Sequence, residues 1–344
     1  MAKTLNLFIT DSIFQYFIAD YMRKTLSEFK TADNILFNVS SNVKVKSAPD
    51  LWFKMLQRPL PAWRKGNSFF LLKQVKVNLR EIQRLVAPYT EVHIFMSTLY
   101  KFQNIVFNTF VKNAPNIKYF NYPDGNNSLF LIKASPKERL ILVGKSILAK
   151  LAGVRYGAFP FYVQDKVGLL AADKIYSCLP AQVNFFPGEV VDIGLPKIAL
   201  EYKADRLCLF CGMPLEQGMH KEWQKKLEET AAFIAARHRD LVLLYKPHPR
   251  EEVSLTYPFF AKYGFQLWQA GKYPDTNLEE AIFNGFSPQV IYSWWSSVLI
   301  NAKLMLGDQV DCVAYKGVEF FELEHAEGLA VRKLYQQLGI KYIP

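Results

Sequence analysis

Three short polar clusters each follow an apolar stretch of the chain, and each carries groups that could act in a transfer reaction. Asp124, in a Pro-Asp-Gly sequence, offers a carboxylate that could take the proton from an attacking hydroxyl. His248 stands between two prolines, whose restricted backbone suits a fixed donor to a developing negative charge. Ser296 and Ser297 precede an apolar helical stretch, where hydroxyls and backbone N–H groups form an anion site.

Each cluster also has a plain structural interpretation. Pro-Asp-Gly is a common turn sequence, a histidine beside prolines can belong to a surface loop, and a serine before a helix can serve only as its N-cap. The combination of a base, an imidazole and a phosphate site on two domains favours the functional interpretation of the clusters over the structural one.

The elements that would position these clusters alternate between short apolar runs and longer amphipathic segments, which predicts parallel, doubly wound sheets of the α/β class. Polar clusters at the ends of such strands lie where these folds keep their binding edges. The expected strands are 5–10, 34–39, 91–96, 117–122, 206–210, 240–245, 265–269 and 289–293, and the expected helices are 13–29, 222–239, one from 296 and one near 322–338.

A proline-rich stretch, 160–196, interrupts this alternation and predicts a domain boundary. We expect a first domain at 1–175 that carries the base and a second domain at 200–320 that binds the donor. A last helix within 321–344 is expected to pack back on the first domain.

The composition narrows the class of protein. The chain has 42 Lys and Arg against 31 Asp and Glu, a net charge of +11, which favours an anionic partner. Cys208 and Cys211 have metal-site spacing, but they lie in an apolar run and no second pair completes a site, so we expect buried thiols. The charges are scattered and no nucleic-acid module is recognisable, so a basic nucleic-acid binder is only a remote alternative.

The segment 137–155 contains five basic residues and one acid among apolar residues at near-helical spacing. It either lies on an anionic membrane or forms a core-facing helix with a solvated basic side. No run reaches the ~18 apolar residues that a spanning helix needs. We expect a cytoplasmic protein, peripheral at the inner face of a bacterial inner membrane through its basic face.

The order of the three clusters resembles the bacterial sialyltransferases of GT-B fold, whose motifs are an acidic pair before Gly, a His-Pro pair and a Ser-Ser pair. The resemblance extends to the sequence Phe-Cys-Gly-Met-Pro-Leu at 210–215, and to Glu279 and Gly285 ahead of the serines. It implies two Rossmann-like domains facing a central cleft, an inverting transfer of sialic acid from CMP-sialic acid, and a surface-glycan acceptor, lipid-linked or capsular.

The same resemblance implies roles for individual residues. Asp124 would be the general base and His248 would stabilise the departing CMP. The donor-binding residues would be Gly212, Lys246, Pro249, Glu279, Ser296 and Ser297.

Pro123 stands where the family has a second acid, which leaves Asp124 as the only carboxylate of that motif. A CMP-sugar has a single phosphate and the chain has no Asp-x-Asp motif, so we expect no metal and no cofactor. Transfer from CMP-Kdo or another sugar donor on the same fold is the alternative.

Overall fold

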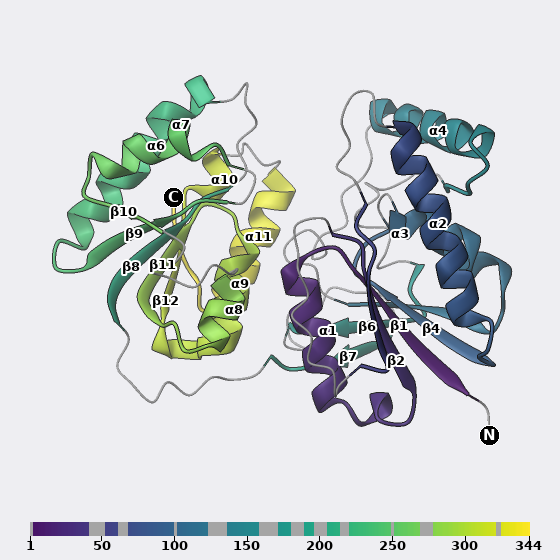
Figure 1. The fold of residues 1–344 in the computed structure, drawn as a ribbon. Coiled ribbons are helices and arrows are strands. Elements are labelled where there is room, and N and C mark those ends of the chain that lie inside the picture. Colours follow the sequence, from purple (N-terminus) through teal and green to yellow (C-terminus); the bar gives the residue numbers. More distant parts are fainter. Residues whose placement is uncertain are drawn as a thin grey trace. The chain divides into compact units, whose positions relative to one another are not determined.

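The computed structural model describes residues 3–40, 52–60, 68–99, 102–122, 136–157, 171–179, 189–195, 205–213, 220–248, 251–268, 278–320 and 325–344. These residues belong to two compact units, Met1–Gly194 and Leu195–Pro344. Each unit is built on one parallel sheet with helices on both faces (Figure 1). The α/β class expected from the alternation of the sequence is therefore confirmed.

The sheet of the first unit has the strand order β3-β2-β1-β4-β5-β6-β7, and all its described pairings are parallel. Its strands are β1 (Thr4–Thr10), β2 (Asp33–Asn38), β3 (Lys54–Gln57), β4 (Glu91–Met96), β5 (Ile117–Asn121), β6 (Lys174–Ser177) and β7 (Val190–Asp192). Its helices are α1 (Ile13–Thr25), α2 (Ser68–Val86), α3 (Phe102–Thr109) and α4 (Pro136–Leu151), with short 3-10 turns η1 (Ser27–Phe29) and η2 (Val111–Asn113).

Strand β1 shows why these segments are strands, because alternate side chains point to opposite faces and both faces are covered. Leu7 and its neighbours on one face belong to the same core cluster as Val75 of α2 and Val106 of α3. Phe8 points to the other face, where its ring stacks on Phe95 at 4.3 Å between centroids. A strand buried on both sides is therefore mostly apolar, and in β1 only Asn6 interrupts the apolar residues between the two terminal threonines.

The sheet of the second unit has the order β10-β9-β8-β11-β12-β13, again parallel. Its strands are β8 (Asp205–Cys211), β9 (Val242–Lys246), β10 (Gln266–Leu267), β11 (Pro288–Ser293), β12 (Asp311–Tyr315) and β13 (Lys341–Ile343). Its helices are α6 (His220–Arg237), α7 (Val253–Ala261), α8 (Leu278–Phe283), α9 (Ser297–Leu306), α10 (Gly317–Phe320) and α11 (His325–Gln337), with the 3-10 turn η5 (Gly307–Gln309).

Both sheets contain the strand order 3-2-1-4-5-6 of dinucleotide-binding folds. In this topology the chain direction of the crossovers reverses between the first and fourth strands, and ligands bind outside the carboxyl ends at that point. The switch points here lie between β1 and β4 in the first unit and between β8 and β11 in the second.

Aromatic packing holds the second sheet against α6. Trp294, just after β11, and Trp223 of α6 are both buried, and their ring centroids lie 5.2 Å apart. The Trp294 indole Nε1 also donates to Thr230 Oγ1 at 2.9 Å, so its polar edge is satisfied inside the core. The end of β11, from which Ser296 follows, is thus fixed by packing.

Most expected elements agree with the structure to within one or two residues. The expected helix 13–29 is a difference, because α1 ends at Thr25 and Leu26 adopts an extended conformation (φ −87°, ψ 124°) before η1. The expected strand 265–269 is reduced to Gln266–Leu267. The strands β6 and β7 belong to the first sheet, so the first unit runs beyond residue 175 to Gly194.

Helix α4 differs from the core-facing alternative for the segment 137–155. Leu142 is buried, but Leu140, Leu148 and Leu151 are 74%, 67% and 80% exposed. The core-facing interpretation is therefore wrong for most of the apolar side chains of this helix. Within the described ranges, no helix is long and apolar enough to cross a membrane.

Candidate functional site

The second unit brings most of the expected site residues to one edge of its sheet. Strand β8 lies between β9 and β11, with Cys211 opposite Lys246 and Phe210 opposite Tyr292. Because the three strands are parallel, the residues that follow them meet at the same carboxyl edge. This edge flanks the switch point between β8 and β11.

Hydrogen bonds connect these three strand ends. The Gly212 N–H donates to the Lys246 carbonyl at 2.9 Å, which extends the β8–β9 pairing by one residue. The Ser293 hydroxyl donates to the Cys211 carbonyl at 2.9 Å and is fully buried. The carboxyl edge is therefore a rigid platform for the loops that leave it.

The loop that carries His248 is fixed by a carboxylate which the sequence did not single out. The His248 N–H donates to Glu251 Oε2 at 2.9 Å, and the Glu251 N–H returns a bond to the His248 carbonyl at 2.9 Å. The buried Tyr245 hydroxyl donates to the other oxygen of Glu251. Burial and the Glu251 charge together raise the pKa of Tyr245, so this phenol stays protonated and remains a donor. The half-buried residue His248 thus has both its backbone N–H and its carbonyl anchored by Glu251.

A side chain at position 212 would displace that same carboxylate. A Cβ on this residue would overlap Glu251 Oε2 and lie 3.2 Å from the Tyr245 hydroxyl. The resemblance assigned the glycine to donor binding, whereas the structure gives a reason within the protein itself: Glu251 occupies the space that a side chain at position 212 would take. The sequence around Gly212 could not reveal its contact with Glu251, because the two residues come together only through the pairing of β8 with β9.

Ser296 is the N-cap of α9, as the structural interpretation of the serine pair predicted. Its φ and ψ are −140° and 138°, and its hydroxyl accepts from the Val298 N–H at 3.3 Å. Ser297 is the first helical residue and is half-buried. The positive end of the α9 dipole therefore points to the carboxyl edge, where it favours an anion.

Glu279 and Lys246 place opposite charges near the end of β8. The Glu279 side chain on α8 is buried and accepts from the Asn301 amide on α9 at 2.9 Å. Burial is the main cause that raises the pKa of the Cys211 thiol to about 12; the Glu279 charge raises it further and the Lys246 charge lowers it. Lys246 Nζ also lies 5.6 Å from the centre of the Trp268 ring.

The cysteines behave as expected from their apolar surroundings. All four are buried and free, and burial raises the pKa of each thiol. Neutral, inaccessible thiols are poor nucleophiles and poor metal ligands. Among the residues that the structure describes, no group of three or more His, Cys, Asp or Glu side chains has a metal-binding arrangement.

The first unit supplies the scaffold before the expected base, but Asp124 itself lies outside the described residues, as does Pro249 of the second unit. Asn121, the last residue of β5, donates to the Ser97 carbonyl at 2.8 Å, and the Tyr122 hydroxyl donates to the Ile9 carbonyl at 3.1 Å. These bonds tie β5 to the ends of β4 and β1. The chain thus leaves for Asp124 from a fixed point at the carboxyl edge.

Another carboxylate stands at this edge of the first sheet. Asp11 directly follows β1, is exposed, and accepts from the Gln103 amide at 2.9 Å. Its backbone N–H donates to Gln15 Oε1 at 2.8 Å. The sequence analysis did not select Asp11, because no short motif surrounds it.

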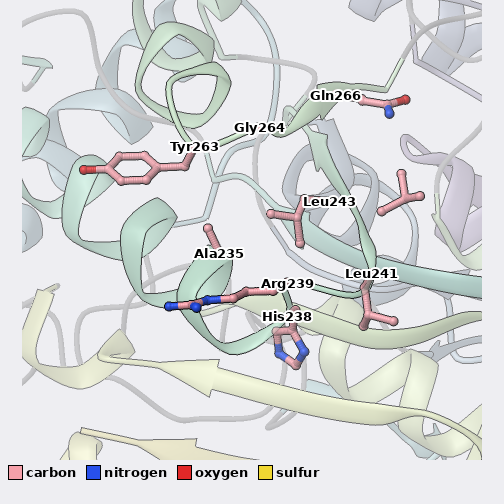
Figure 2. A pocket seen from close by; sticks show the side chains of 9 residues that line it. Ala235, His238, Arg239, Leu241, Leu243, Tyr263, Gly264 and Gln266 are labelled. Atoms are coloured by element: carbon pink, nitrogen blue, oxygen red, sulfur yellow. The ribbon is translucent and has the colours of Figure 1, made fainter.

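A pocket of ≈ 440 Å³ in the second unit lies at the opposite, amino edge of the sheet. Figure 2 shows its lining, which comes from the end of α6, the start of β9 and the turn before β10. Its histidine, His238, contacts the Tyr292 hydroxyl at 2.9 Å. This pocket is distinct from the carboxyl edge that carries the expected donor site.

Comparison with solved structures places the chain in a fold class. It matches a candidate UDP-N-acetylglucosamine 2-epimerase from Listeria monocytogenes with a TM-score of 0.53 and 13% identity, over 91% of this chain and 79% of that one. It also matches UDP-GlcNAc 2-epimerase from Methanocaldococcus jannaschii with a TM-score of 0.49 and 12% identity, over 96% and 92% of the two chains. No protein-family model and no curated protein matches the sequence.

Two consecutive Rossmann-like units with these strand orders, together with the match to the Listeria structure, define a GT-B fold. The GT-B class expected from the sequence is confirmed. The site at the carboxyl edge of the second sheet combines a helix N-terminus, a lysine and an imidazole with a buried carboxylate. Such a set is suited to an anionic group attached to a moiety that offers hydroxyl donors.

Proposed function

We propose that the protein is an inverting glycosyltransferase that moves sialic acid from CMP-sialic acid to a sugar hydroxyl of a bacterial surface glycan. The observation that carries the proposal is the meeting of Gly212, Lys246, His248, Glu279 and the serine pair at one switch point. These residues come from separate stretches of sequence. The resemblance to bacterial sialyltransferases predicted His248 as a catalytic residue and the others as donor-binding residues.

The donor's phosphate is assigned to the start of α9. Ser296 caps this helix with its hydroxyl, so its contribution to an anion is chiefly the order it gives to the helix N-terminus. Ser297 adds a hydroxyl beside the helix N-terminal N–H groups. Lys246 adds a full positive charge, and Glu279 is assigned to the hydroxyls of the ribose.

His248 is assigned to the leaving group. As the bond between the sugar and CMP breaks, negative charge grows on the phosphate oxygen, and an imidazole held on a rigid loop stabilises it without reorganisation. Glu251 is the residue that holds the loop, through the His248 N–H and Tyr245. An acceptor hydroxyl attacks the anomeric carbon from the opposite face, which inverts the configuration, and Asp124 takes its proton.

A CMP-sugar suits this residue set because a single phosphate builds up less charge on departure than a diphosphate does. A helix N-terminus, a lysine and an imidazole are adequate for that charge. We therefore propose that transfer needs no metal and no cofactor. Transfer should continue in EDTA, and a strict requirement for Mg²⁺ or Mn²⁺ would point to a nucleoside diphosphate donor.

The test is release of the nucleotide from alternative donors. The protein is incubated with CMP-sialic acid, CMP-Kdo and UDP-GlcNAc, each with a galactose-terminated acceptor, and CMP or UDP is measured. We expect CMP release and a sialylated product with CMP-sialic acid. CMP release from CMP-Kdo alone would show that the donor sugar is Kdo and not sialic acid. Turnover of UDP-GlcNAc alone would refute the proposal.

A lipid-linked or capsular glycan is proposed as the acceptor, with the enzyme peripheral at the inner face of the bacterial inner membrane. The charge of the chain favours such anionic surroundings. A panel of lipooligosaccharide and capsule oligosaccharides would identify the acceptor by mass spectrometry of the product.

A further inference from the structure

Helix α4 carries more exposed large apolar side chains than any other described element. Across the described residues, eleven large apolar side chains are strongly exposed, and six of these belong to this one helix. They are Leu140, Ile141, Val143, Ile147, Leu148 and Leu151. Such a cluster on one helix marks an interaction surface, whereas single exposed apolar residues need no explanation.

The exposed apolar side of α4 faces away from the core of the first unit. Leu142 is buried and Ala149 packs against the core of the first unit, seven residues further along the same side. Leu140 and Ile147 each lie two positions earlier, which is about 200° around an α-helix. The apolar stripe is therefore nearly opposite the side that attaches the helix to its domain.

Basic residues border this stripe. Arg139 and Lys150 lie on one side of it, Lys145 lies on the other, and all three are exposed. The chain just after α4 approaches α2, since a Cβ on Gly153 would lie 3.6 Å from the Lys76 ammonium. Figure 1 shows α4 and α2 in the same unit. Lys73 and Arg80 are exposed on the same side of α2 as Lys76 and extend the positive surface.

The first unit also carries all of the excess positive charge of the chain. Residues 1–194 contain 25 Lys and Arg against 13 Asp and Glu, whereas residues 195–344 contain 17 against 18. A second copy of the same basic unit is a poor partner for this face, because like charges would meet. An anionic surface complements it.

We propose that α4 docks the first unit on an anionic lipid bilayer, with the helix parallel to the membrane plane. With 16 residues it is about 24 Å long, and its charged residues exclude a spanning position. Leu140, Ile147 and Leu151 enter the boundary between headgroups and acyl chains, and the flanking lysines and arginine contact lipid phosphates. The proposal stands on this helix alone and does not depend on the identity of the sugar donor.

Flotation with vesicles tests the proposal on the full chain. We expect binding to vesicles of phosphatidylglycerol mixed with phosphatidylcholine, weaker binding as salt rises, and at least about tenfold weaker binding to phosphatidylcholine alone. The triple variant Ile147→Gln, Leu148→Gln, Leu151→Gln should lose at least about tenfold in partitioning, because glutamine preserves helix propensity but not apolar surface. Lys145→Glu with Lys150→Glu should weaken binding to the anionic vesicles.

The matched control is the pair Leu255→Gln and Leu329→Gln, which removes exposed leucines from the second unit. This control should bind vesicles like the wild type. Circular dichroism of every variant checks that the fold is retained. The proposal fails if the triple variant floats like the wild type, or if sedimentation shows a wild-type dimer that the triple variant converts to a monomer without any change in lipid binding.

Discussion

The two units share one strand order and differ in what surrounds it. The second unit is nearly neutral and gathers a lysine, an imidazole, a buried carboxylate and a helix N-terminus at its carboxyl edge. The first unit carries the positive charge and an outward-facing apolar helix. The shared sheet therefore specifies where ligands can bind, and the loops and surfaces specify which ligand each unit takes.

The strongest test of this difference compares two histidines at opposite edges of the second sheet. His248→Ala should lower the turnover of transfer by about 10²–10³-fold, the usual loss when one preorganised donor to a developing charge is removed. The unfolding midpoint should change little, because the half-buried side chain contributes little packing. His238→Gln, at the amino edge, should retain wild-type turnover.

Steady-state assays with CMP-sialic acid, together with calorimetric titration of CMP, separate these effects. Equal losses of turnover in the two variants would mean that the edges do not differ in function. A His248→Ala variant with wild-type turnover would remove the imidazole from the mechanism.

Gly212→Ala tests whether Glu251 organises the site. The added methyl group would push Glu251 away from Tyr245 and the His248 N–H, and overpacking of this kind costs about 1–3 kcal/mol of folding stability. CMP binding should weaken with it. Gly144→Ala on α4 is the control, since nothing lies within 4 Å of its new methyl group and alanine favours a helix.

Chemical denaturation and CMP titration of both glycine variants measure the two effects. If Gly212→Ala kept wild-type stability and CMP affinity, Glu251 would not hold the loop in the way its contacts indicate.

Sequence patterns predicted most of the strands that are buried on both faces, because an apolar run such as residues 207–211 of β8 has few other uses. The buried strand β12 (Asp311–Tyr315) was missed. They also predicted Ser296 as the start of a helix, since N-capping is a local property. Glu251 was missed, because no sequence pattern marks its bonds to the His248 N–H and the Tyr245 hydroxyl, and its contact with Gly212 arises only from the pairing of β8 with β9. The sequence left a membrane-facing and a core-facing α4 open, because periodicity shows that a helix has an apolar face, but packing decides which way that face points.

The serine pair separates a structural role from a binding role. Ser296→Ala removes the N-cap of α9 and should cost about 1 kcal/mol of stability, whereas Ser297→Ala, at the first helical position, should cost much less. Both should weaken CMP binding. Denaturation curves and calorimetry of the two variants provide the comparison, and equal stabilities would show that the cap bond to Val298 carries little energy.

The smallest expected effect is the pH dependence that His238 gives to the second unit. Burial, and next the Arg237 charge, lower the pKa of this imidazole below its ordinary value of 6.5, while Asp240 and Asp311 oppose the shift. Below about pH 6.5 the unfolded chain binds a proton that the folded chain takes up less readily, so stability falls as the pH drops and is unaffected above that value. Urea unfolding followed by tryptophan fluorescence between pH 5 and 8 measures the effect.

The His238→Gln variant should lose this slope of stability between pH 6.5 and 5, and its profile above pH 6.5 should match the shape of the wild-type profile. The carboxylates do not interfere, because the lowered pKa values of Glu229 and Asp308 affect stability only below their ordinary values of 4.5 and 3.8. An unchanged slope in the variant would mean that the environment of His238 does not resist protonation.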